Sequence, residues 1–240
     1  MIIDSLRLLV RSGLTLCAVT ACADAQMNGQ DDFQAARARM VETQIRQRDV
    51  RDAAVLQAMG RVPRHLFVPD DQRPFAYDDR PLPIGRGQTI SQPYIVAYMT
   101  EALQLSPAHT VLEIGTGSGY QAAILADIVT QVYSIEIVPD LAESARRALA
   151  QSGYRNVEVR TGNGYLGWPD RAPFDRIIVT AAPAEIPQAL VDQLAVGGIM
   201  VVPVGTAHQE IVVVTKTPSG ATEKRTIEVR FVPMVSKPRD

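Results

Sequence analysis

The chain has 240 residues, of which 46% are hydrophobic and 21% are charged, as in globular proteins with a sizeable core. Its length suits one large α/β domain with an extension better than two independent domains. The net charge of −2 provides no electrostatic basis for binding nucleic acid or an anionic membrane surface. No segment reaches the ~18 to 20 apolar residues that a membrane-spanning helix requires.

The cysteines and histidines argue against a metal site or a thiol nucleophile. Cys17 and Cys22 both lie near the N-terminus, so nothing downstream can form a disulfide or bind zinc through sulfur. His65, His109 and His208 are scattered, and none has a ligand partner at i+3 or i+4. We therefore expect no metal.

Residues 1–30 differ from the rest of the chain. Two arginines precede an apolar run of small residues, Ser12–Ala23, and Ala23-Asp-Ala25 matches a signal-peptide cleavage site. Val19-Thr-Ala-Cys22 also resembles a lipobox, in which Cys22 would carry a lipid anchor. The alternatives are a frayed or disordered extension, or an upstream start codon wrongly included.

Between residues 31 and 103 the sequence predicts three helices separated by less regular segments. The helices are expected at Asp31–Asp49, Arg51–Met59 and Tyr94–Leu103. Two prolines bracket an expected extended connection over residues 62–69. Residues 70–83 are polar and contain proline, which predicts a loop.

The stretch Gly85-Arg-Gly-Gln-Thr-Ile-Ser-Gln-Pro93 is a polar loop between apolar segments. Its position directly before a helix is typical of loops that carry function. Ser91 could equally be the cap of that helix. Position alone gives the two interpretations equal weight.

A short apolar strand, Val111–Ile114, is followed by glycines at positions 115, 117 and 119 and then by an apolar helical run, Gln121–Val129. A sharp strand-to-helix turn needs glycine because the backbone takes φ > 0 or lies against a ligand. The helix that follows directs its first N–H groups at whatever occupies the turn. The stretch predicts a nucleotide cradle at the carboxyl edge of a parallel sheet, with an ordinary turn as the alternative.

The glycine spacing separates two kinds of cradle. A dinucleotide fingerprint, G-x-G-x-x-G, would place glycine at position 120, where this chain has Tyr120. The observed pattern, Glu113-x-Gly-x-Gly-x-Gly119, resembles motif I of the S-adenosylmethionine-dependent methyltransferases. That resemblance implies that Glu113 lies near the methionine part of the cofactor.

The rest of the chain alternates between predicted strands and helices. Strands are expected at 132–137, 157–160, 174–180 and 199–202, helices at 139–152 and 186–194, and a closing antiparallel pair at 211–215 and 225–232. This βαβ alternation predicts a doubly wound, mostly parallel sheet with right-handed crossovers.

Two polar residues follow the next strands at the edge where such sheets bind ligands. Glu136 comes 21 residues after Gly115, close to the spacing at which an acid accepts the ribose hydroxyls of a nucleotide. The amide of Asn163 could meet the adenine edge, because it donates and accepts at once. The alternatives are a surface acid at a strand end and, for Gly162-Asn-Gly164, simple turn chemistry.

Several longer motifs resemble one family, the protein-L-isoaspartate (D-aspartate) O-methyltransferases, over roughly Met40 to Pro233. The Gly87–Pro93 run is the most specific, since generic methyltransferases lack it. The matching segments are Val62–Val68, Leu82–Pro93, Val111–Tyr120, Ala172–Pro183, Val202–Gly205 and Arg230–Pro233.

The resemblance implies a class I methyltransferase fold, which is Rossmann-like, with an N-terminal helical extension. Residues 31–240 would form a single domain. Within it, residues 31–105 would supply the N-terminal helices and the substrate loop, and residues 106–240 the cofactor-binding sheet.

The site residues carry over position by position. Ser91 matches the active-site serine. The expected cofactor-binding residues are Glu113, Gly115, Gly117, Gly119, Glu136, Asn163, Gly164, Thr89 and Ile90. Asn163 stands where the family usually has aspartate. The asparagine keeps an acceptor for the adenine amino group but loses a charge.

The implied reaction is methyl transfer from S-adenosyl-L-methionine to the free carboxylate of L-isoaspartyl and D-aspartyl residues in damaged proteins and peptides. That carboxylate is already ionised at pH 7 and can attack in line without a general base. Catalysis then consists mainly of positioning and desolvation. We expect Ser91 to orient the carboxylate as a hydrogen-bond donor, with no covalent enzyme intermediate.

Two other functions are kept as alternatives: a non-catalytic binder of damaged peptides and, less favoured, an NAD-linked oxidoreductase. The expected partners are isoaspartyl proteins and peptides, and we expect a monomer. The resemblance implies a cytoplasmic enzyme. Export to the periplasm is the alternative if residues 1–25 act as a signal peptide.

Overall fold

The computed structural model describes residues 32–237. The signal-like segment of residues 1–30, with its lipobox cysteine, lies outside the described residues. Within the described range, no helix is long and apolar enough to span a membrane.

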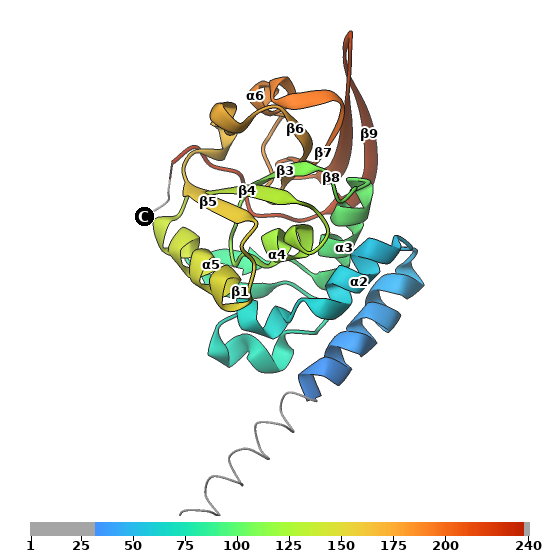
Figure 1. Cartoon of the computed structure of the whole chain (residues 1–240), viewed down its shortest axis with the longest axis vertical. Helices are drawn as coiled ribbons and strands as arrows, with labels where there is room; N and C mark the ends of the chain where they lie inside the picture. The colour runs from blue at the N-terminus through green and yellow to red at the C-terminus, as the bar shows by residue number, and fades with distance from the viewer. Residues whose placement is uncertain (1–31, 238–240) are drawn as a thin grey trace, which may run out of the picture.

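A seven-stranded sheet forms the centre of the molecule, with the strand order β5-β4-β3-β6-β7-β8-β9 (Figure 1). The first five strands in this order run parallel, and β8 and β9 add an antiparallel edge. This topology confirms the predicted doubly wound, mostly parallel sheet. The strands are β3 (Thr110–Ile114), β4 (Gln131–Glu136), β5 (Val157–Thr161), β6 (Phe174–Val179), β7 (Leu194–Gly205), β8 (Gln209–Thr217) and β9 (Gly220–Val229).

The chain enters this sheet in the middle, at β3, and builds outward in both directions. It reaches β5 through α4 (Tyr120–Ala126) and α5 (Pro139–Gln151), and it builds the other half through β6 and α6 (Gln188–Asp192). Helices α4 and α5 lie on one face of the sheet and α6 on the other (Figure 1). The carboxyl end of β3 is therefore the topological switch point, where ligands bind in such sheets.

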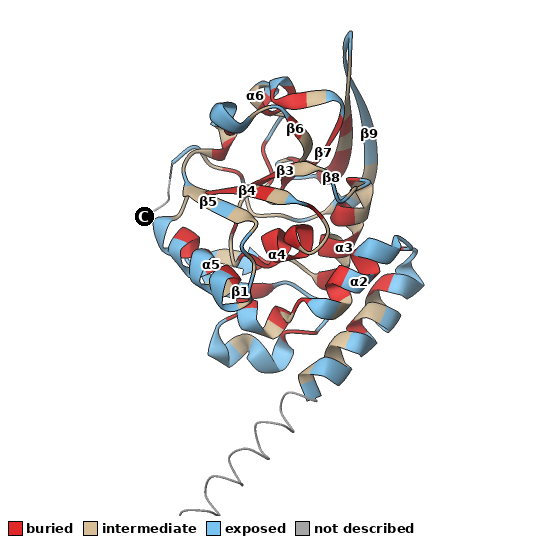
Figure 2. Cartoon of the chain, in the orientation of Figure 1, coloured by how far each residue is buried: buried red, intermediate tan, exposed pale blue. Residues whose placement is uncertain are grey.

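The two faces of the sheet bury two hydrophobic clusters. In β3, Val111 packs into the cluster that contains α4, whereas Leu112 and Ile114 pack into the cluster that contains α6. The alternation follows from the two-residue period of a strand. The central strands are buried along most of their length (Figure 2), which explains why they read as continuous apolar runs.

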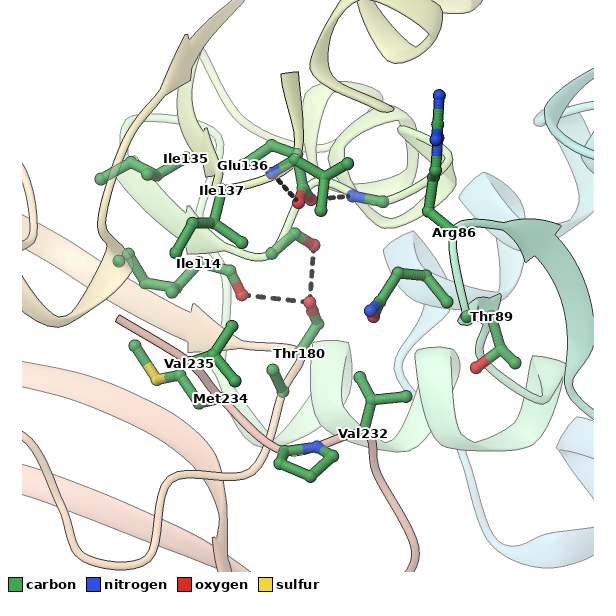
Figure 3. A pocket seen from close by; sticks show the side chains of 18 residues that line it. Arg86, Thr89, Ile114, Ile135, Glu136, Ile137, Thr180, Val232, Met234 and Val235 are labelled. Atoms are coloured by element: carbon green, nitrogen blue, oxygen red, sulfur yellow. Dashed lines mark hydrogen bonds between the residues drawn. The ribbon is translucent and has the colours of Figure 1, made fainter. Parts of the chain in front are cut away.

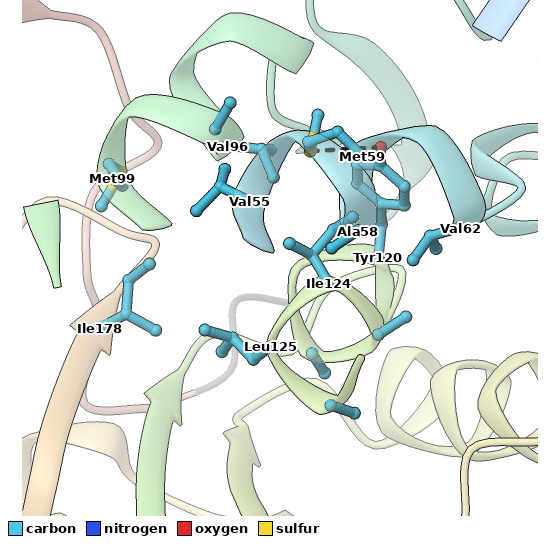
Figure 4. Packing of buried hydrophobic residues seen from close by; sticks show 14 of the residues in the cluster. Val55, Ala58, Met59, Val62, Val96, Met99, Tyr120, Ile124, Leu125 and Ile178 are labelled. Carbon is cyan, nitrogen blue, oxygen red and sulfur yellow. Dashed lines mark hydrogen bonds between the residues drawn. The ribbon is translucent and has the colours of Figure 1, made fainter. Parts of the chain in front are cut away.

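The helices that precede the sheet share the cluster of α4. Helix α2 (Ala53–Arg61) begins where the Asp52 side chain accepts a hydrogen bond from Val55 N at 2.9 Å. Its Met59 meets Tyr120, whose hydroxyl donates to Met59 Sδ at 3.8 Å. Figure 4 shows these residues packed beside Ile124 of α4. Helix α3 (Pro93–Ala102) contributes to the same cluster.

The N-terminal arm is helical but changes pitch. Residues 32–39 are α-helical, η1 (Met40–Ile45) is a π-helix and η2 (Arg46–Arg48) is a 3-10 helix. The predicted helix over 31–49 is therefore helical from 32 to 48, but it is not one regular α-helix. Asp49 has φ 68° and ends it.

The extended connection predicted over residues 62–69 is wrong in its centre. A 3-10 helix, η3 (Arg64–Phe67), forms there, because both Arg64 and Phe67 turn inward and are buried. The two prolines bracket a tight turn rather than a straight segment.

Residues 70–93 also contain more structure than the predicted loops. The segment over 70–83 includes the 3-10 helix η4 (Asp70–Phe75) and the start of β1 (Leu82–Gly85). The polar loop is the turn and second strand of a hairpin, since β2 (Gln88–Ile90) pairs antiparallel with β1. The hairpin fixes the direction in which this loop enters α3.

Three predicted boundaries move by several residues. The helix expected at 186–194 shortens to α6, because Pro187 stands at its N-cap. The strand expected at 199–202 is the centre of the longer β7. The last strand, expected at 225–232, begins earlier and ends at Val229.

If residues 31–240 form one domain, core truncations on either side of the boundary at 105–106 should lower one common unfolding transition. Met59→Ala and Ile124→Ala remove side chains that are 0% exposed, so each should cost about 2–5 kcal/mol. Urea unfolding followed by circular dichroism and by the fluorescence of Trp168, which belongs to the cluster on the opposite face, measures this. If the circular dichroism of Met59→Ala changed at a lower urea concentration than its Trp168 fluorescence, the chain would contain two domains.

Candidate active site

A cavity of about 140 Å³ lies at the carboxyl ends of β3, β4 and β6 (Figure 3). The turns after these strands, the β1–β2 hairpin and a segment near the C-terminus form its walls. The lining residues are Arg86–Thr89, Ile114, Gly115, Gly117, Ile135–Val138, Gly164, Thr180, Ala181 and Val232–Val235. The cavity therefore occupies the switch point of the sheet.

Two positions of the turn after β3 require glycine. Gly115 and Gly117 have φ 98° and 54°, which L side chains rarely adopt. A Cβ on Gly115 would collide with the hydroxyl of Thr180. That hydroxyl lies 2.6 Å from Gly115 O, and Gly115 N donates to Ile135 O at 2.8 Å. Neighbouring strands thus hold the turn on both sides.

Glu136 ties the end of β4 to this turn. Its Oε2 accepts from Gly117 N at 2.7 Å and its Oε1 accepts from Val138 N at 3.0 Å (Figure 3). The side chain is only 5% exposed, yet it lines the cavity. Each carboxylate oxygen accepts more than one hydrogen bond, so Glu136 can also receive hydroxyl groups from a ligand.

Gly119 and Gly164 provide close packing. A Cβ on Gly119 would lie 3.3 Å from Ala145 and from Leu149, so this glycine lets the start of α4 approach α5. Gly119 does not line the cavity. A Cβ on Gly164 would overlap Ile114, and Gly164 does line the cavity.

Glu113 lies beneath the turn rather than in the cavity wall. It is 0% exposed, and it accepts a hydrogen bond from the Ser134 hydroxyl, which is 2.6 Å from Thr116 Oγ1. Within the described residues its Oε1 has no hydrogen-bond partner. Burial, partly opposed by the Ser134 hydrogen bond, raises the Glu113 pKa from 4.5 to about 8. A neutral carboxyl group therefore stands between β3 and β4 at pH 7.

Asn163 is the N-cap of the 3-10 helix η5 (Gly164–Leu166). Its Oδ1 accepts from Tyr165 N at 3.0 Å. Asn163 is outside the cavity lining, although its neighbour Gly164 is part of it. The turn chemistry considered for this residue is thus present, and its contact with adenine stays a prediction.

Three cavities meet at the β1–β2 hairpin. The first is the switch-point cavity. A small inner cavity lies between the glycine turn and α3, and an outer groove lies between α3 and the end of β9. Thr89 and Thr180 line all three, Ser91 lines the inner cavity and the groove, and Ile90 lines the inner cavity. The predicted Thr89–Ser91 segment therefore stands where these spaces join.

Ser91 does not cap α3. The N-cap is Gln92, and no side-chain cap bond forms there. The cap interpretation of Ser91 is therefore wrong. What the structure does show is a bond to its backbone, since the Ser91 carbonyl accepts from Arg64 Nη2 at 2.8 Å.

The outer groove has charged side chains at its rim. Arg48 lies over the Tyr94 ring, with Cζ 3.6 Å from the ring centroid, and pairs with Asp79 at 3.1 Å. Glu228 and Arg230 line the groove on the side of β9. The groove continues along the backbone of the chain just after β9.

Sequence reasoning missed the residues that only the fold brings to the site. Thr180 follows β6 at the switch point. Residues 232–235 cross the carboxyl ends of the strands because Ala182 N donates to Val232 O at 2.8 Å and Met234 N donates to Ala182 O at 2.8 Å. The Arg230–Pro233 motif was visible in the sequence, but nothing local indicated that it closes a cavity.

The raised pKa of Glu113 predicts how stability depends on pH. An unfolded chain ionises this group near its ordinary value of 4.5, whereas the folded chain holds the proton up to about 8. The folded state therefore binds more protons in this range, and stability falls as pH rises through it. In Glu113→Gln this loss is absent. As pH rises, the free energy of unfolding of the variant should therefore increase relative to that of the native chain by up to about 1.4 kcal/mol per pH unit.

Urea unfolding of both proteins at a series of pH values between these limits measures the difference. Glu158→Gln, at a half-exposed position in β5, is the control and should not show the trend. A Glu113→Gln difference that stays constant with pH would contradict the raised pKa.

Comparison with known proteins gives a consistent result. Residues 35–239 match the family model described as Protein-L-isoaspartate(D-aspartate) O-methyltransferase. A protein-L-isoaspartate O-methyltransferase of Gloeobacter violaceus is 58% identical over 204 residues, which are 84% of this chain and 100% of that protein. One from Synechococcus is 56% identical over 216 residues, covering 87% of this chain and 88% of that protein.

Solved structures agree with these relatives. A protein-L-isoaspartate O-methyltransferase structure aligns with a TM-score of 0.78 at 28% identity, covering 84% of this chain and 67% of that one. A Plasmodium falciparum structure with the same family name, in complex with S-adenosyl-L-homocysteine, aligns with a TM-score of 0.75 at 25% identity, covering 84% and 99%. This chain belongs to the protein-L-isoaspartate (D-aspartate) O-methyltransferase family.

Proposed function

We propose that this chain is a protein repair methyltransferase. It transfers a methyl group from S-adenosyl-L-methionine to the free carboxylate of L-isoaspartyl and D-aspartyl residues in damaged proteins and peptides. Two relatives named protein-L-isoaspartate O-methyltransferase are 56–58% identical to it over most of their length. The observation in this chain that supports the proposal best is the position of Thr89 and Thr180, which line both the switch-point cavity and the outer groove.

The residues of the switch-point cavity fit this cofactor. Glu136 faces the cavity with free acceptor capacity for ribose hydroxyls. The side chains of Ile137, Val138 and Met234 form apolar walls suited to an adenine ring. The open backbone at Gly115 and Gly117 leaves room for the methionine part.

The oxidoreductase alternative fits less well. A dinucleotide needs space for a pyrophosphate at the start of the helix, with glycine at the third position. Here Tyr120 occupies that position and is buried against α2, and Gly119 packs on α5. A non-catalytic binder of damaged peptides would have no use for the cofactor cavity.

On the acceptor side, Ser91 is the residue proposed to orient the substrate carboxylate. Its hydroxyl caps no helix, and the residue lines both spaces through which a peptide could reach the cofactor cavity. The Thr89 and Thr180 side chains stand beside the same passage. A peptide lying in the outer groove could place its side chain between them.

When bound, S-adenosylmethionine supplies a methyl group activated by a positive sulfur, and the acceptor carboxylate is already ionised at pH 7. The protein therefore has no proton to move. Within the described residues, no histidine, cysteine, lysine or aspartate lines the three cavities. The residues that are present can bind and orient the two reactants and exclude water, which is sufficient for this transfer.

The monomeric state and the compartment belong to this proposal as well. We expect the monomer to be the active form. A cytoplasmic location and export through residues 1–25, with or without a lipid on Cys22, are the two alternatives. The intact mass of the protein from its native cell distinguishes them.

Glu136→Ala should weaken S-adenosylmethionine binding. The change removes the acceptor for ribose and also releases Gly117 N, so the loss should be roughly 1.5–3 kcal/mol, the range for hydrogen bonds to a charged group. Isothermal titration calorimetry measures it. Glu143→Ala, at an exposed site on α5, is the control. Equal affinity in both variants would mean that Glu136 serves the turn alone.

The full-length chain should methylate an isoaspartyl peptide and leave the aspartyl peptide of the same sequence unmodified. The extra backbone carbon of the isoaspartyl residue changes where its free carboxylate lies, and the site is proposed to select that position. Radiolabelled methyl transfer to both peptides measures this. Equal transfer to the two, or to neither, would refute the proposed substrate.

Ser91→Ala should lower kcat/KM for the isoaspartyl peptide by about ten- to hundred-fold, because one hydrogen bond to a charged group is lost. Stability and S-adenosylmethionine affinity should change little, since the hydroxyl caps no helix. Ser152→Ala, at the end of α5, is the matched control and should keep full activity. A fall in melting temperature without a fall in kcat/KM would contradict the proposed role.

A further inference from the structure

Arg64 is the one arginine or lysine that is buried among residues 32–237. It is 0% exposed and is one of the largest fully buried side chains. None of the ion pairs found within residues 32–237 includes it. Burial lowers the Arg64 pKa to about 10, so the guanidinium stays charged at pH 7.

Burying a cation without an opposite charge is costly. A methionine or leucine would fill the same space without that cost. The guanidinium must therefore do something that an apolar side chain could not do at this position, and its partners indicate what this is.

Each partner of Arg64 belongs to a different segment. Its Nε donates to Ala76 O at 2.7 Å, just after η4, and its Nη2 donates to Ser91 O at 2.8 Å, just after β2. Its Cζ lies 4.9 Å from the centroid of the Tyr120 ring, at the first residue of α4. The planar fork of an arginine can hold several partners in fixed directions at once.

The Ser91 contact has a geometric consequence. On one side of Ser91, the backbone is fixed by the β1–β2 ladder, in which Ile90 pairs with Leu82. On the other side, the carbonyl that Arg64 holds belongs to the peptide bond linking Ser91 to Gln92. With both flanking peptides fixed, the Cα–Cβ direction of Ser91 is fixed as well.

The contact with Tyr120 relates this serine to the cofactor turn. Tyr120 directly follows the glycine turn and is 1% exposed, so its ring is held by the core. Arg64 packs on that ring and bonds the Ser91 backbone, and it thereby joins the acceptor loop to the start of α4.

We propose that Arg64 is a positioning residue for methyl transfer: it fixes the peptide after Ser91 relative to the glycine turn and so aims the Ser91 hydroxyl. The inference rests on the proposed role of Ser91. Arg64 itself lines none of the three cavities, so it acts through Ser91 and does not touch the substrate.

The test compares Arg64→Met, Arg64→Lys and Ser91→Ala in the full-length chain. Arg37→Met is the matched control, because Arg37 also holds a backbone carbonyl, Gly60 O at 2.7 Å, and contacts Tyr77. It has no contact with Ser91. Methyl transfer to an isoaspartyl peptide, S-adenosylmethionine affinity and melting temperature are measured for each.

In Arg64→Met we expect KM for the peptide to rise and kcat/KM to fall by about ten-fold or more, with S-adenosylmethionine affinity within about two-fold of native. Arg64→Lys keeps the charge and one donor nitrogen, so it should recover part of the loss. Arg37→Met should lose melting temperature and keep native kinetics. A merely structural role predicts instead a lower kcat from less folded enzyme, with KM unchanged.

A double-mutant cycle decides whether Arg64 acts through Ser91. If it does, Arg64→Met should have little further effect in a Ser91→Ala background, whereas independent effects would multiply. Multiplied effects, or an Arg64→Met enzyme with native KM, would overturn the inference. If Arg64→Met does not fold, the same criteria apply to Arg64→Lys.

The parallel Ser91→Ala measurement separates the two proposals. A fully active Ser91→Ala enzyme would remove the role of Ser91 and the inference with it. An impaired Ser91→Ala enzyme beside a native Arg64→Met enzyme would overturn the inference about Arg64 alone.

Discussion

The position of β3 between β4 and β6 is the constraint on which the site depends. Because the chain builds the sheet outward from β3 in both directions, the ends of three parallel strands meet at one crevice. The glycine turn then lies between a carboxylate on one side, Glu136, and a hydroxyl on the other, Thr180. Both hold its backbone, and the Thr180 hydroxyl leaves no room for a side chain at Gly115. The switch-point cavity is a consequence of this arrangement.

Two buried ionisable groups, Glu113 and Arg64, pack against the residues of the site, and they differ in their charge at neutral pH. Glu113 lies under the turn with its pKa raised by burial, so at neutral pH it is a neutral polar link between β3 and β4. Arg64 keeps its charge without an acidic partner, and its hydrogen bonds go to the carbonyls of Ala76 and Ser91. Glu113 supports the glycine turn, and Arg64 supports the backbone at Ser91. Thr89 and Thr180 line the inner cavity, as do Ser91 and the glycine turn.

Local sequence patterns predicted the sheet, the glycine turn and the position of Glu136 at the end of β4, because strand-to-helix punctuation and spacing depend on neighbours in the chain. They could not place the Glu113 side chain, since a strand alternates its faces and only the packed sheet shows that this acid lies beneath the turn. Thr180 and residues 232–235 reach the site through strand order and the pairing of Ala182 with Pro233, which no short window contains. The inward turn of Arg64 also breaks the usual rule that arginines stay exposed.

The central claim is that this protein positions its reactants and moves no proton. The most direct test is the single-turnover rate of methyl transfer to an isoaspartyl peptide, with enzyme and both ligands saturating, between about pH 5.5 and 7.5, where the substrate carboxylate is fully or almost fully ionised. We expect a rate that stays nearly constant across this range. A rate that rises about ten-fold per pH unit would require a general base and would contradict it.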